Sequence, residues 1–348
     1  MSPSAVRCPL VRGPVDSQTM RVLVTGGTGY LGQAIVRALV ARGHSPVVYA
    51  RSPQSAVPSP QSAAKMSSEA ISPEIASELI FVHGDVRDRD ALVAAARGCD
   101  AMIHTAALVA VWRPRAADFD DVNVGGLRHA LEAVRQHGLQ RLVYTSSFLA
   151  LPPAGRTTTL DSNDYQRTKT IAERVAAEAH ASGVPIVRLY PGVIYGPGLM
   201  SDGNLVGKQI ADHLKGWLPG LLGADRIWSF AWVESVAAAH VAALEHPSPA
   251  PAYQVGGPNE PQMRPFEILR DLKGTALPQR LPWWTGHLAA IVDPARPAIL
   301  GAPRQITHKT VAIFRHDWPL DSSAAQRDLG YTYPALTDGI TRVVEARS

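Results

Sequence analysis

The chain alternates between short apolar runs and longer stretches in which apolar residues recur at helical spacing. Runs of four or five apolar or β-branched residues are typical of buried strands, and apolar residues three and four apart are typical of the helices that cover them. Predicted strands lie at 22–25, 46–50, 79–82, 101–104 and 142–144. Predicted helices lie around 35–40, 89–97, 122–134 and 165–176. This alternation predicts an α/β fold with a doubly wound parallel sheet.

A cluster of glycines joins the first predicted strand to the first predicted helix. Gly27, Gly29 and Gly32 have the GxGxxG spacing of a dinucleotide-binding turn, in which glycines permit the turn, the approach of a pyrophosphate and the packing of helix on strand. The helix N-terminus also offers unpaired N–H groups to phosphates. The residues predicted to bind the cofactor here are Gly26, Thr28, Gly29, Tyr30, Leu31 and Gly32.

The end of the second predicted strand indicates which dinucleotide binds. NAD-binding folds usually hold the ribose 2′-hydroxyl with an acidic residue about 20 residues past the glycines. This chain has no Asp or Glu between Asp16 and Glu69, and Arg51 and Ser52 follow the strand instead. A cation and a hydroxyl suit a 2′-phosphate, so we expect NADP(H) rather than NAD(H). The alternative is that Arg51 is a solvated charge at a strand end.

Small and hydroxyl-bearing residues follow the later strands. Ligands of doubly wound sheets bind at the carboxyl ends of the strands. We expect Asp85 and Val86 beside the adenine, and Thr105, Ala106 and Ala107 to leave room for the cofactor. Ser146 and Ser147 follow the fifth strand, where their hydroxyls are placed either as active-site groups or as a strand cap.

Tyr165 and Lys169 lie four residues apart in the next predicted helix. This spacing places both side chains on one helical face. A nearby ammonium favours the phenolate and lowers the reference pKa of tyrosine, which is about 10. The pair therefore suggests a proton donor and acceptor that works near neutral pH.

Composition excludes several other classes of protein. Of the 348 residues, 46% are hydrophobic, and 34 basic residues against 30 acidic ones leave a net charge of +4. No basic run with interleaved aromatics indicates nucleic-acid binding. Cys8 and Cys99 form neither a disulfide framework nor a metal motif, the twelve histidines show no HExxH spacing, and no run of about 18 apolar residues is present. We expect a cytoplasmic protein without a metal site.

Two segments lack the signals of ordered structure. Residues 1–19 have no apolar core of signal-peptide length, and we expect a disordered tail. Residues 53–77 are rich in Ser, Pro and Ala without a hydrophobic period, and we expect a flexible insertion.

The order of these features resembles the extended branch of the short-chain dehydrogenase/reductase superfamily, the NAD-dependent epimerase/dehydratase type. Further segments similar to that branch lie at 188–198, 230–236 and 329–340. The stretches 106–112 and 318–324 look most like dihydroflavonol reductase-like and 3β-hydroxysteroid dehydrogenase-like proteins. The resemblance covers residues 20–345 apart from the 53–77 insertion. Glu234-Ser235 and Leu189-Tyr190-Pro191 depart from the family's usual residues, in positions that bear on substrate and local packing.

The resemblance implies a division of the chain into two parts. Residues 20–192 would form a Rossmann dinucleotide-binding domain. Residues 193–348 would form mainly a smaller α/β substrate-binding domain, from which a segment around 226–246 returns to the first domain. Pro191, Gly192 and Val193 would lie beside the nicotinamide.

The resemblance also implies catalytic roles. Tyr165 would exchange a proton with the carbonyl oxygen, while Lys169 holds the nicotinamide ribose and depresses the pKa of Tyr165. Ser147 would donate a hydrogen bond to the developing alkoxide, a role that Ser146 could take instead. Asn123 would support the lysine through water.

These observations favour an NADP(H)-dependent oxidoreductase that interconverts a ketone or aldehyde and an alcohol on a fairly apolar small molecule. The alternatives are a nucleotide-sugar epimerase or dehydratase with bound NAD, which Arg51 disfavours, and a non-catalytic NADP-sensing regulator, which would be expected to have lost Tyr165 and Lys169.

The substrate side is less distinct. Most apolar residues between 199 and 222 are expected to be core, and Trp283 and Trp284 are expected to act as lid residues. The expected partner is a small-molecule substrate. A homodimer through the helices of Asn123 and Tyr165 is implied by resemblance. Firm membrane association is not expected, because the stretch after residue 281 contains a proline and lacks a basic face.

Overall fold

The computed structural model describes residues 19–51, 79–160, 162–295 and 306–347. The predicted tail, apart from Thr19, the predicted insertion at 53–77 and the predicted cofactor residue Ser52 lie outside the described residues.

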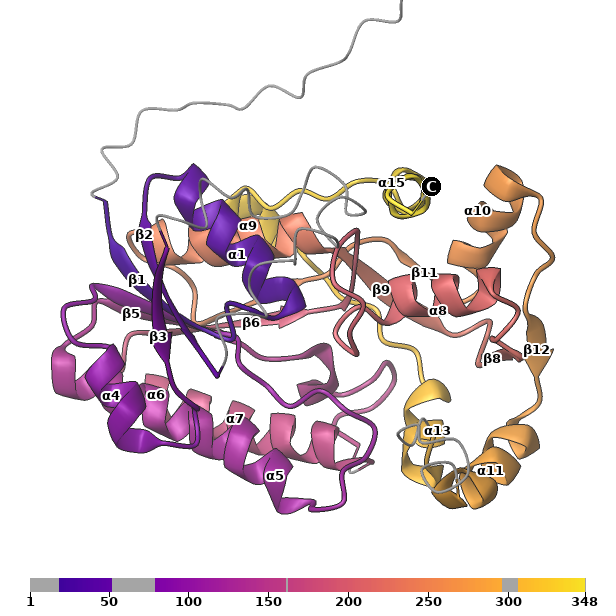
Figure 1. Cartoon of the computed structure of the whole chain (residues 1–348), viewed down its shortest axis with the longest axis horizontal. Coiled ribbons are helices and arrows are strands. Elements are labelled where there is room, and N and C mark those ends of the chain that lie inside the picture. The colour runs from indigo at the N-terminus through magenta and orange to yellow at the C-terminus, as the bar shows by residue number, and fades with distance from the viewer. Residues whose placement is uncertain (1–18, 52–78, 161, 296–305, 348) are drawn as a thin grey trace, which may run out of the picture.

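A parallel sheet forms the centre of the larger part of the molecule (Figure 1). Within the described residues it has seven strands in the order β10-β6-β5-β4-β1-β2-β3, and each neighbouring pair is parallel. The strands are β1 (Arg21–Thr25), β2 (Ser45–Ala50), β3 (Ile80–His83), β4 (Ala101–His104), β5 (Arg141–Thr145), β6 (Ile186–Pro191) and β10 (Ala252–Val255). Successive connections run outward in opposite directions from β1 and β4, which makes their carboxyl ends the switch point where ligands bind in such sheets. The prediction of a doubly wound α/β fold is confirmed.

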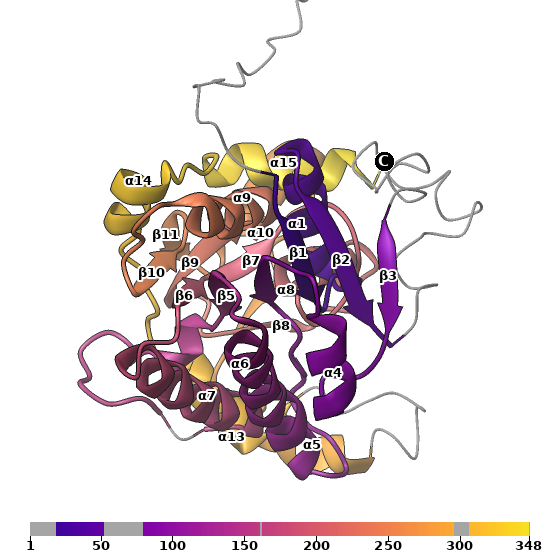
Figure 2. The same cartoon turned by 90° about the vertical axis from the view of Figure 1, so that its left-hand side faces the viewer.

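Helices cover both faces of this sheet (Figure 2). One face carries α1 (Tyr30–Ala41) and α9 (Val233–Glu245), which pack against each other, and α14 (Ser323–Leu329). The other face carries α4 (Arg89–Ala95), α6 (Gly126–His137) and α7 (Asp164–Ala181). Side chains alternate between the two layers because successive strand residues point to opposite faces. In β1, for example, Val22 and Val24 join the core under α1, and Leu23 joins the core under α4 and α6.

The helix expected over 122–134 is not continuous. A short α5 (Ala117–Phe119) leads into a π-helical turn, η2 (Asp120–Gly125), and α6 begins only after it. Single π turns inside helices are frequent at functional sites. The interruption places Asn123 on the π turn, whereas the sequence pattern predicted it on a regular helix.

A smaller, mixed part lies beyond the carboxyl ends of the strands (Figure 1). Its strands are β7 (Val193–Tyr195), β8 (Gly220–Leu222), β9 (Ile227–Trp232), β11 (Asn259–Pro261) and β12 (Gln279–Leu281), paired as β11-β9-β7 and β12-β8. Its helical elements are α8 (Leu205–Leu214), α10 (Arg264–Lys273), α11 (Trp283–Val292), η4 (Asp293–Ala295), α13 (His308–Phe314) and α15 (Leu336–Glu345). A third core cluster, rich in aromatic residues around Trp228 and Phe230, joins β7, β8, β9, α8, α10, α13 and α15. No helix among the described residues is long and apolar enough to cross a bilayer.

Candidate active site

The turn between β1 and α1 is too tightly packed for any side chain at two of its glycines. Gly26 has φ of 72°, and a Cβ there would lie 2.7 Å from the Ala106 nitrogen. A Cβ at Gly32 would lie 2.0 Å from the Gly26 carbonyl oxygen. This close packing brings the backbone of 26–32 to the switch point between β1 and β4. The glycines therefore build a bare backbone surface at the ligand-binding edge.

The N-terminus of α1 fits a pyrophosphate. Gly29 is its N-cap, no side chain caps the first turn, and that turn has no acidic residue. The predicted residues Thr28, Tyr30 and Leu31 flank or open this turn. Uncapped N–H groups at the positive end of a helix dipole favour an anion. This chain's own residues thus fit a dinucleotide phosphate at the predicted position.

The ends of β4 and β6 complete the same edge. The Thr25 hydroxyl pairs with His104 Nδ1 at 2.8 Å, which ties the end of β1 to the end of β4. Thr105, Ala106 and Ala107 continue from this point, half-buried. Pro191 ends β6 and Val193 begins β7; between them a Cβ at Gly192 would lie 2.4 Å from the Ser229 carbonyl oxygen. The structure therefore places these predicted cofactor residues along one edge of the sheet.

Basic side chains gather where β2 and β3 end. Arg51 follows β2 and is exposed. Asp85 follows β3, and its carboxylate pairs with Arg87 at 2.7 Å. The hydrogen bonds from Arg87 and the charge of Arg51 hold the pKa of Asp85 below its usual value. Val86 is buried in the core, against Gly126, so its side chain is a packing group. Arg87 is a second cation at this corner that the sequence reasoning did not select.

Tyr165 and Ser147 meet at the carboxyl end of β5. Asn163 caps α7 by accepting from the Gln166 N–H at 2.9 Å, which starts the helix just before Tyr165. Tyr165 is half-buried, and Ser147 lies close enough to it to affect its pKa. Burial raises the pKa of Tyr165, and Ser147 acts in the opposite direction. Lys169, which was expected to depress this pKa, is not among the groups that shift it in this structure, and the net shift is upward.

Lys169 is almost completely buried, one turn along the same helix. Its Nζ donates to the Thr145 carbonyl oxygen at 2.9 Å and lies 5.2 Å from the centre of the Tyr144 ring. Burial lowers the pKa of Lys169 to about 8, and the charge of Glu173 raises it. The side chain is therefore mainly an ammonium at neutral pH. Because an ammonium has three donors, the bond to Thr145 leaves donor capacity for a further ligand.

Glu173 anchors a buried polar network behind the lysine. Its carboxylate accepts from Ser146 Oγ at 2.9 Å, from Arg188 Nη1 at 2.7 Å and from the Tyr190 hydroxyl at 2.7 Å. Ser146 is thus engaged on one side of β5 while Ser147 faces Tyr165. The sequence reasoning missed Glu173, although an acidic residue four positions after Lys169 on the same helical face was a usable signal.

Asn123 forms hydrogen bonds with the backbone of the loop that follows β4. Its side-chain oxygen accepts from the Leu108 N–H at 2.7 Å, and its amide group donates to the Leu108 carbonyl at 3.3 Å and to Thr168 Oγ1 at 3.0 Å. The expected contact was with Lys169 through water. The direct contacts instead join the π turn, the loop after Ala107 and the helix of Tyr165.

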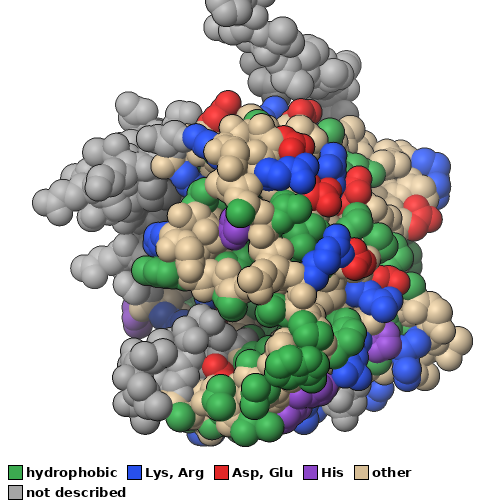
Figure 3. All heavy atoms as spheres, turned by 90° about the vertical axis from the view of Figure 1, so that its right-hand side faces the viewer, with side chains coloured by type: hydrophobic (Ala, Val, Ile, Leu, Met, Phe, Trp, Pro, Cys, Tyr) green, Lys and Arg blue, Asp and Glu red, His purple; other side chains and the backbone are tan. Residues whose placement is uncertain are grey.

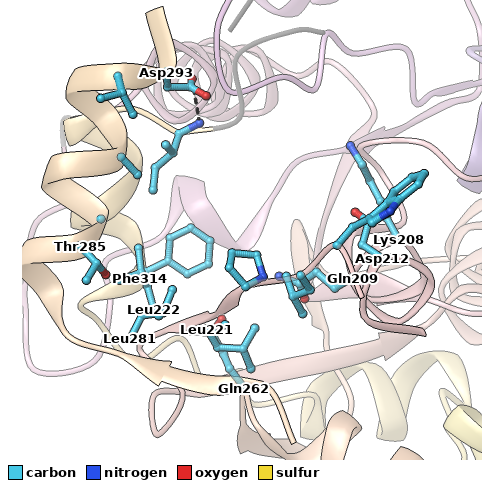
Figure 4. Close-up of a pocket in the computed structure, with 18 of the residues that line it drawn as sticks. Lys208, Gln209, Asp212, Leu221, Leu222, Gln262, Leu281, Thr285, Asp293 and Phe314 are labelled. Carbon is cyan, nitrogen blue, oxygen red and sulfur yellow. Dashed lines mark hydrogen bonds between the residues drawn. The ribbon is translucent and has the colours of Figure 1, made fainter. Parts of the chain in front are cut away.

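A pocket of about 920 Å³ lies in the smaller part of the molecule (Figure 4). Apolar side chains from β8, β12 and the end of α13 line one side, and Lys208, Gln209 and Asp212 of α8 lie at the other end. Phe314 lines the pocket, and its ring stacks on that of Trp228 with 5.2 Å between the ring centres. The Trp228 and Phe148 ring centres are 6.1 Å apart. Since Phe148 directly follows Ser147, a continuous aromatic layer connects the pocket wall with the tyrosine site.

The two tryptophans expected as a lid do not line this pocket. Thr285, Gly286 and Ala289 of α11 line it. Trp284 is 64% exposed on the outer side of the helix, and Trp283 is covered by the Arg315 guanidinium at 5.4 Å. The direction of each side chain follows from its position on the helix. Trp284 and Trp283, one and two positions before Thr285, point away from the face that Thr285 shares with Ala289. Most apolar residues between 199 and 222 were expected to be core; Val206, Ile210 and Leu221 are, but Leu199, Met200, Leu214 and Trp217 are exposed.

The described residues contain no cluster of three or more His, Cys, Asp or Glu side chains suited to a metal ion.

A bare glycine turn at the switch point of a doubly wound sheet, with a tyrosine, a serine and a lysine at the neighbouring strand end, defines a nicotinamide dinucleotide-binding protein. Residues 22–256 match the model of the NAD dependent epimerase/dehydratase family, and the chain belongs to this family, within the extended short-chain dehydrogenases/reductases. Members are NAD(P)-dependent dehydrogenases, reductases and epimerases, so the chain is an enzyme of this general type.

Similar proteins support the same assignment. The chain is 28% identical to sterol demethylase protein B of Methylococcus capsulatus over 332 residues, 89% of this chain and 93% of that protein. It is 31% identical to a 2-alkyl-3-oxoalkanoate reductase of Stenotrophomonas maltophilia over 245 residues, 67% of this chain and 68% of that protein. The fold matches the Bordetella bronchiseptica enzyme WbmG in complex with NAD and UDP with a TM-score of 0.70 at 20% identity, covering 94% of this chain and 95% of that one.

Proposed function

We propose that this chain is an NADP(H)-dependent oxidoreductase that interconverts a ketone or aldehyde and an alcohol on a fairly apolar small molecule. The observation that carries the proposal is the placement of Ser147 beside Tyr165, one helical turn from the buried ammonium of Lys169. All three groups lie at the strand edge that also carries the glycine turn. A proton donor, a hydroxyl donor and a cation at one point are the groups that carbonyl reduction requires.

The bound nicotinamide would supply or accept the hydride. Tyr165 holds its proton at neutral pH, because burial raises its pKa, and it would give that proton to the carbonyl oxygen. Ser147 would donate a hydrogen bond to the same oxygen as negative charge develops there. The Lys169 ammonium would hold the cofactor ribose with the donor capacity that its bond to Thr145 leaves over. In the oxidation direction the same groups act in reverse.

Arg51 and Arg87 support a preference for NADP(H). Both are exposed at the ends of β2 and β3, where the ribose of a dinucleotide lies in doubly wound folds. A 2′-phosphate would gain charge-assisted hydrogen bonds from guanidinium groups. Asp85, which follows β3, is already paired with Arg87 and is therefore a poor acceptor for a ribose hydroxyl.

The pocket supports an apolar substrate. Its walls from β8, β12 and α13 are leucine and phenylalanine side chains, and Phe314 in this wall packs through Trp228 on Phe148, the residue after Ser147. Relatives whose names describe 2-alkyl-3-oxoalkanoate and 3β-hydroxysteroid substrates act on molecules of this polarity. The apolar part of a ketone would occupy this pocket.

The test is a Tyr165→Phe variant assayed by NADPH consumption with a panel of apolar ketones. Loss of the general acid should reduce kcat by about 10²- to 10⁴-fold, while NADPH binding and the thermal midpoint stay near wild type. Tyr333→Phe is the matched control, because Tyr333 is a partly exposed tyrosine packed on Tyr331 and away from the sheet edge. Full activity of Tyr165→Phe would remove Tyr165 from the chemistry. Turnover of a nucleotide sugar with retained NAD would favour the epimerase alternative.

A further inference from the structure

Helix α11 presents an apolar face to solvent. Trp284, Leu288 and Ile291 are 64%, 52% and 65% exposed. Their spacing of four and three residues places them on one side of the helix. We call these three side chains the α11 apolar face. Figure 3 shows hydrophobic side chains gathered low on this side of the molecule. Contiguous exposed apolar surface of this kind marks a binding surface more often than isolated exposed residues do.

Basic and histidine side chains border this face, and most of them come from the neighbouring helix α13. Arg315 covers the Trp283 ring and lies 3.0 Å from His287 Nε2. His287 stacks on His308, with ring centres 5.3 Å apart, and Lys309 beside it is exposed. The sequence alone showed no basic face on this stretch, because the cations reach it only through the packing of α13 on α11.

Acidic side chains are absent from the described outer surface of these two helices. Asp293, the acidic residue of the stretch 283–316, is buried and accepts from the Ile306 N–H at 3.3 Å. The border of the α11 apolar face is therefore positive. A second copy of this chain docked through the same face would bring these like charges together around a two-fold axis. A surface with anionic groups would neutralise them.

The inner side of α11 forms a wall of the substrate pocket. Thr285, Gly286 and Ala289 line the pocket, and a Cβ at Gly286 would lie 2.6 Å from the side chain of Leu222. One helix thus separates an apolar pocket from an apolar outer face. Aromatic and aliphatic side chains flanked by cations are the composition of segments that lie in the interface of a membrane.

We propose that the α11 apolar face docks on an anionic phospholipid surface, with Trp284, Leu288 and Ile291 in the acyl-headgroup boundary and Lys309 and Arg315 against the lipid phosphates. The contact is peripheral. It also rests on the proposed function in one respect, since it places the pocket wall where an apolar ketone would be dissolved.

The test is co-sedimentation of the full chain with vesicles of phosphatidylcholine alone and of phosphatidylcholine mixed with phosphatidylglycerol. Wild type should bind the anionic vesicles, and high salt should weaken this binding. Leu288→Gln/Ile291→Gln should lower the bound fraction about tenfold or more. Leu272→Gln/Leu277→Gln is the matched control, because these leucines are exposed elsewhere, at 42% and 37%. Lys309→Glu should reduce binding to anionic vesicles only.

Three outcomes would overturn the proposal. They are equal sedimentation with and without vesicles, equal loss in the α11 variant and its control, and a doubled molar mass in solution that only the α11 variant abolishes. The last result would assign the face to a second copy. NADPH binding measured on each variant keeps this test separate from the proposed function, because the α11 variant should bind cofactor as wild type does.

Discussion

At the scale of single residues, the charge of Lys169 depends on a carboxylate that lies outside the reacting groups. Glu173 is one turn further along α7, and its charge opposes the effect of burial on the lysine. The other titratable or charged groups around Lys169 are Tyr165 on its own helix, His104 on β4, Tyr144 on β5, and Arg188 and Tyr190 on β6.

Glu173→Gln should lower the pKa of Lys169 below its value of about 8, because the neighbouring negative charge is removed. Lys169 would then lose its proton at lower pH, and the alkaline decline of kcat would move in the same direction. The chain has six lysines, so NMR of ¹³Cε-labelled lysine can follow Lys169 directly, with Lys169→Arg to assign the signal. Glu178→Gln, an exposed change on the same helix, and Tyr190→Phe, which keeps the carboxylate, should leave the titration unchanged. An unchanged Lys169 titration in Glu173→Gln would contradict the assignment.

The adjacent serines make a matched pair. Ser147 contacts Tyr165, whereas Ser146 donates to Glu173 at 2.9 Å. Ser147→Ala should lower kcat by about 10²- to 10³-fold through loss of an oxyanion donor. Ser146→Ala should retain most of the activity. Steady-state assays of both variants measure the two kcat values. A larger loss of kcat in Ser146→Ala than in Ser147→Ala would assign the oxyanion donor to Ser146.

The sequence predicted the residues with local signals and missed those that depend on tertiary packing. Tyr165 and Lys169 follow from helical spacing, and Ser147 from its place after a buried strand. The bonds from Arg188 and Tyr190 to Glu173 could not be predicted, because they need β6 to lie beside β5 in the observed register. The same holds for Asn123, whose contact with Leu108 depends on the π turn.

At the scale of elements, the end of β2 should set cofactor preference. Arg51→Ala should weaken NADPH binding by about 10-fold or more, since a charge-assisted hydrogen bond contributes about 1.5–3 kcal/mol, and should leave NADH binding unchanged. Arg97→Ala, an exposed arginine beyond α4, is the control. Fluorescence titration with both cofactors measures the ratio. Equal weakening for both cofactors would mean that Arg51 does not contact a 2′-phosphate.

The strands of the sheet and the helices that cover it were predictable because, in each segment, the spacing of apolar residues and the length of the segment indicate the same type of element. The five predicted strands all occur, with ends shifted by one residue or less. The π turn was not predictable, because apolar residues at 122, 124 and 127 fit an uninterrupted helix equally well. In the smaller part, strands of three residues carry too little periodicity to be recognised.

At the scale of the whole molecule, two buried histidines should make stability depend on pH. Burial lowers the pKa of His104 to about 3 and that of His240 to about 4. His240 donates through Nδ1 to the Val236 carbonyl at 2.7 Å and accepts from Thr145 Oγ1 at 2.8 Å, which requires the neutral ring. The folded state therefore does not take up these protons, whereas the unfolded chain does so below about pH 6.5.

Stability should consequently fall as pH falls from about 6.5 to 4, by up to about 1.4 kcal/mol per pH unit for each histidine. Urea unfolding at a series of pH values measures the slope. His240→Gln should be less stable at neutral pH but show a shallower dependence. A pH dependence equal to that of wild type would show that His240 is protonated in the folded state.

The pocket and the α11 apolar face are properties of the whole molecule that no sequence window contains. Pocket walls come from α8, β8, β12, α11 and α13, which are distant along the chain. Trp283 and Trp284, which were expected to act as a lid, show why the sequence could not predict the pocket wall. A shift of one or two positions along the helix determines whether a side chain faces the pocket or the solvent.

The central claim is hydride transfer to a carbonyl at the Tyr165 site. The most direct measurement is mass spectrometry of the alcohol formed from an apolar ketone by the wild-type chain and NADPH deuterated at the nicotinamide C4 on one or the other face. We predict one deuterium on the carbinol carbon from one of the two labelled cofactors and none with Tyr165→Phe at matched times. Product without deuterium from either cofactor, or equal labelling by Tyr165→Phe, would contradict the account.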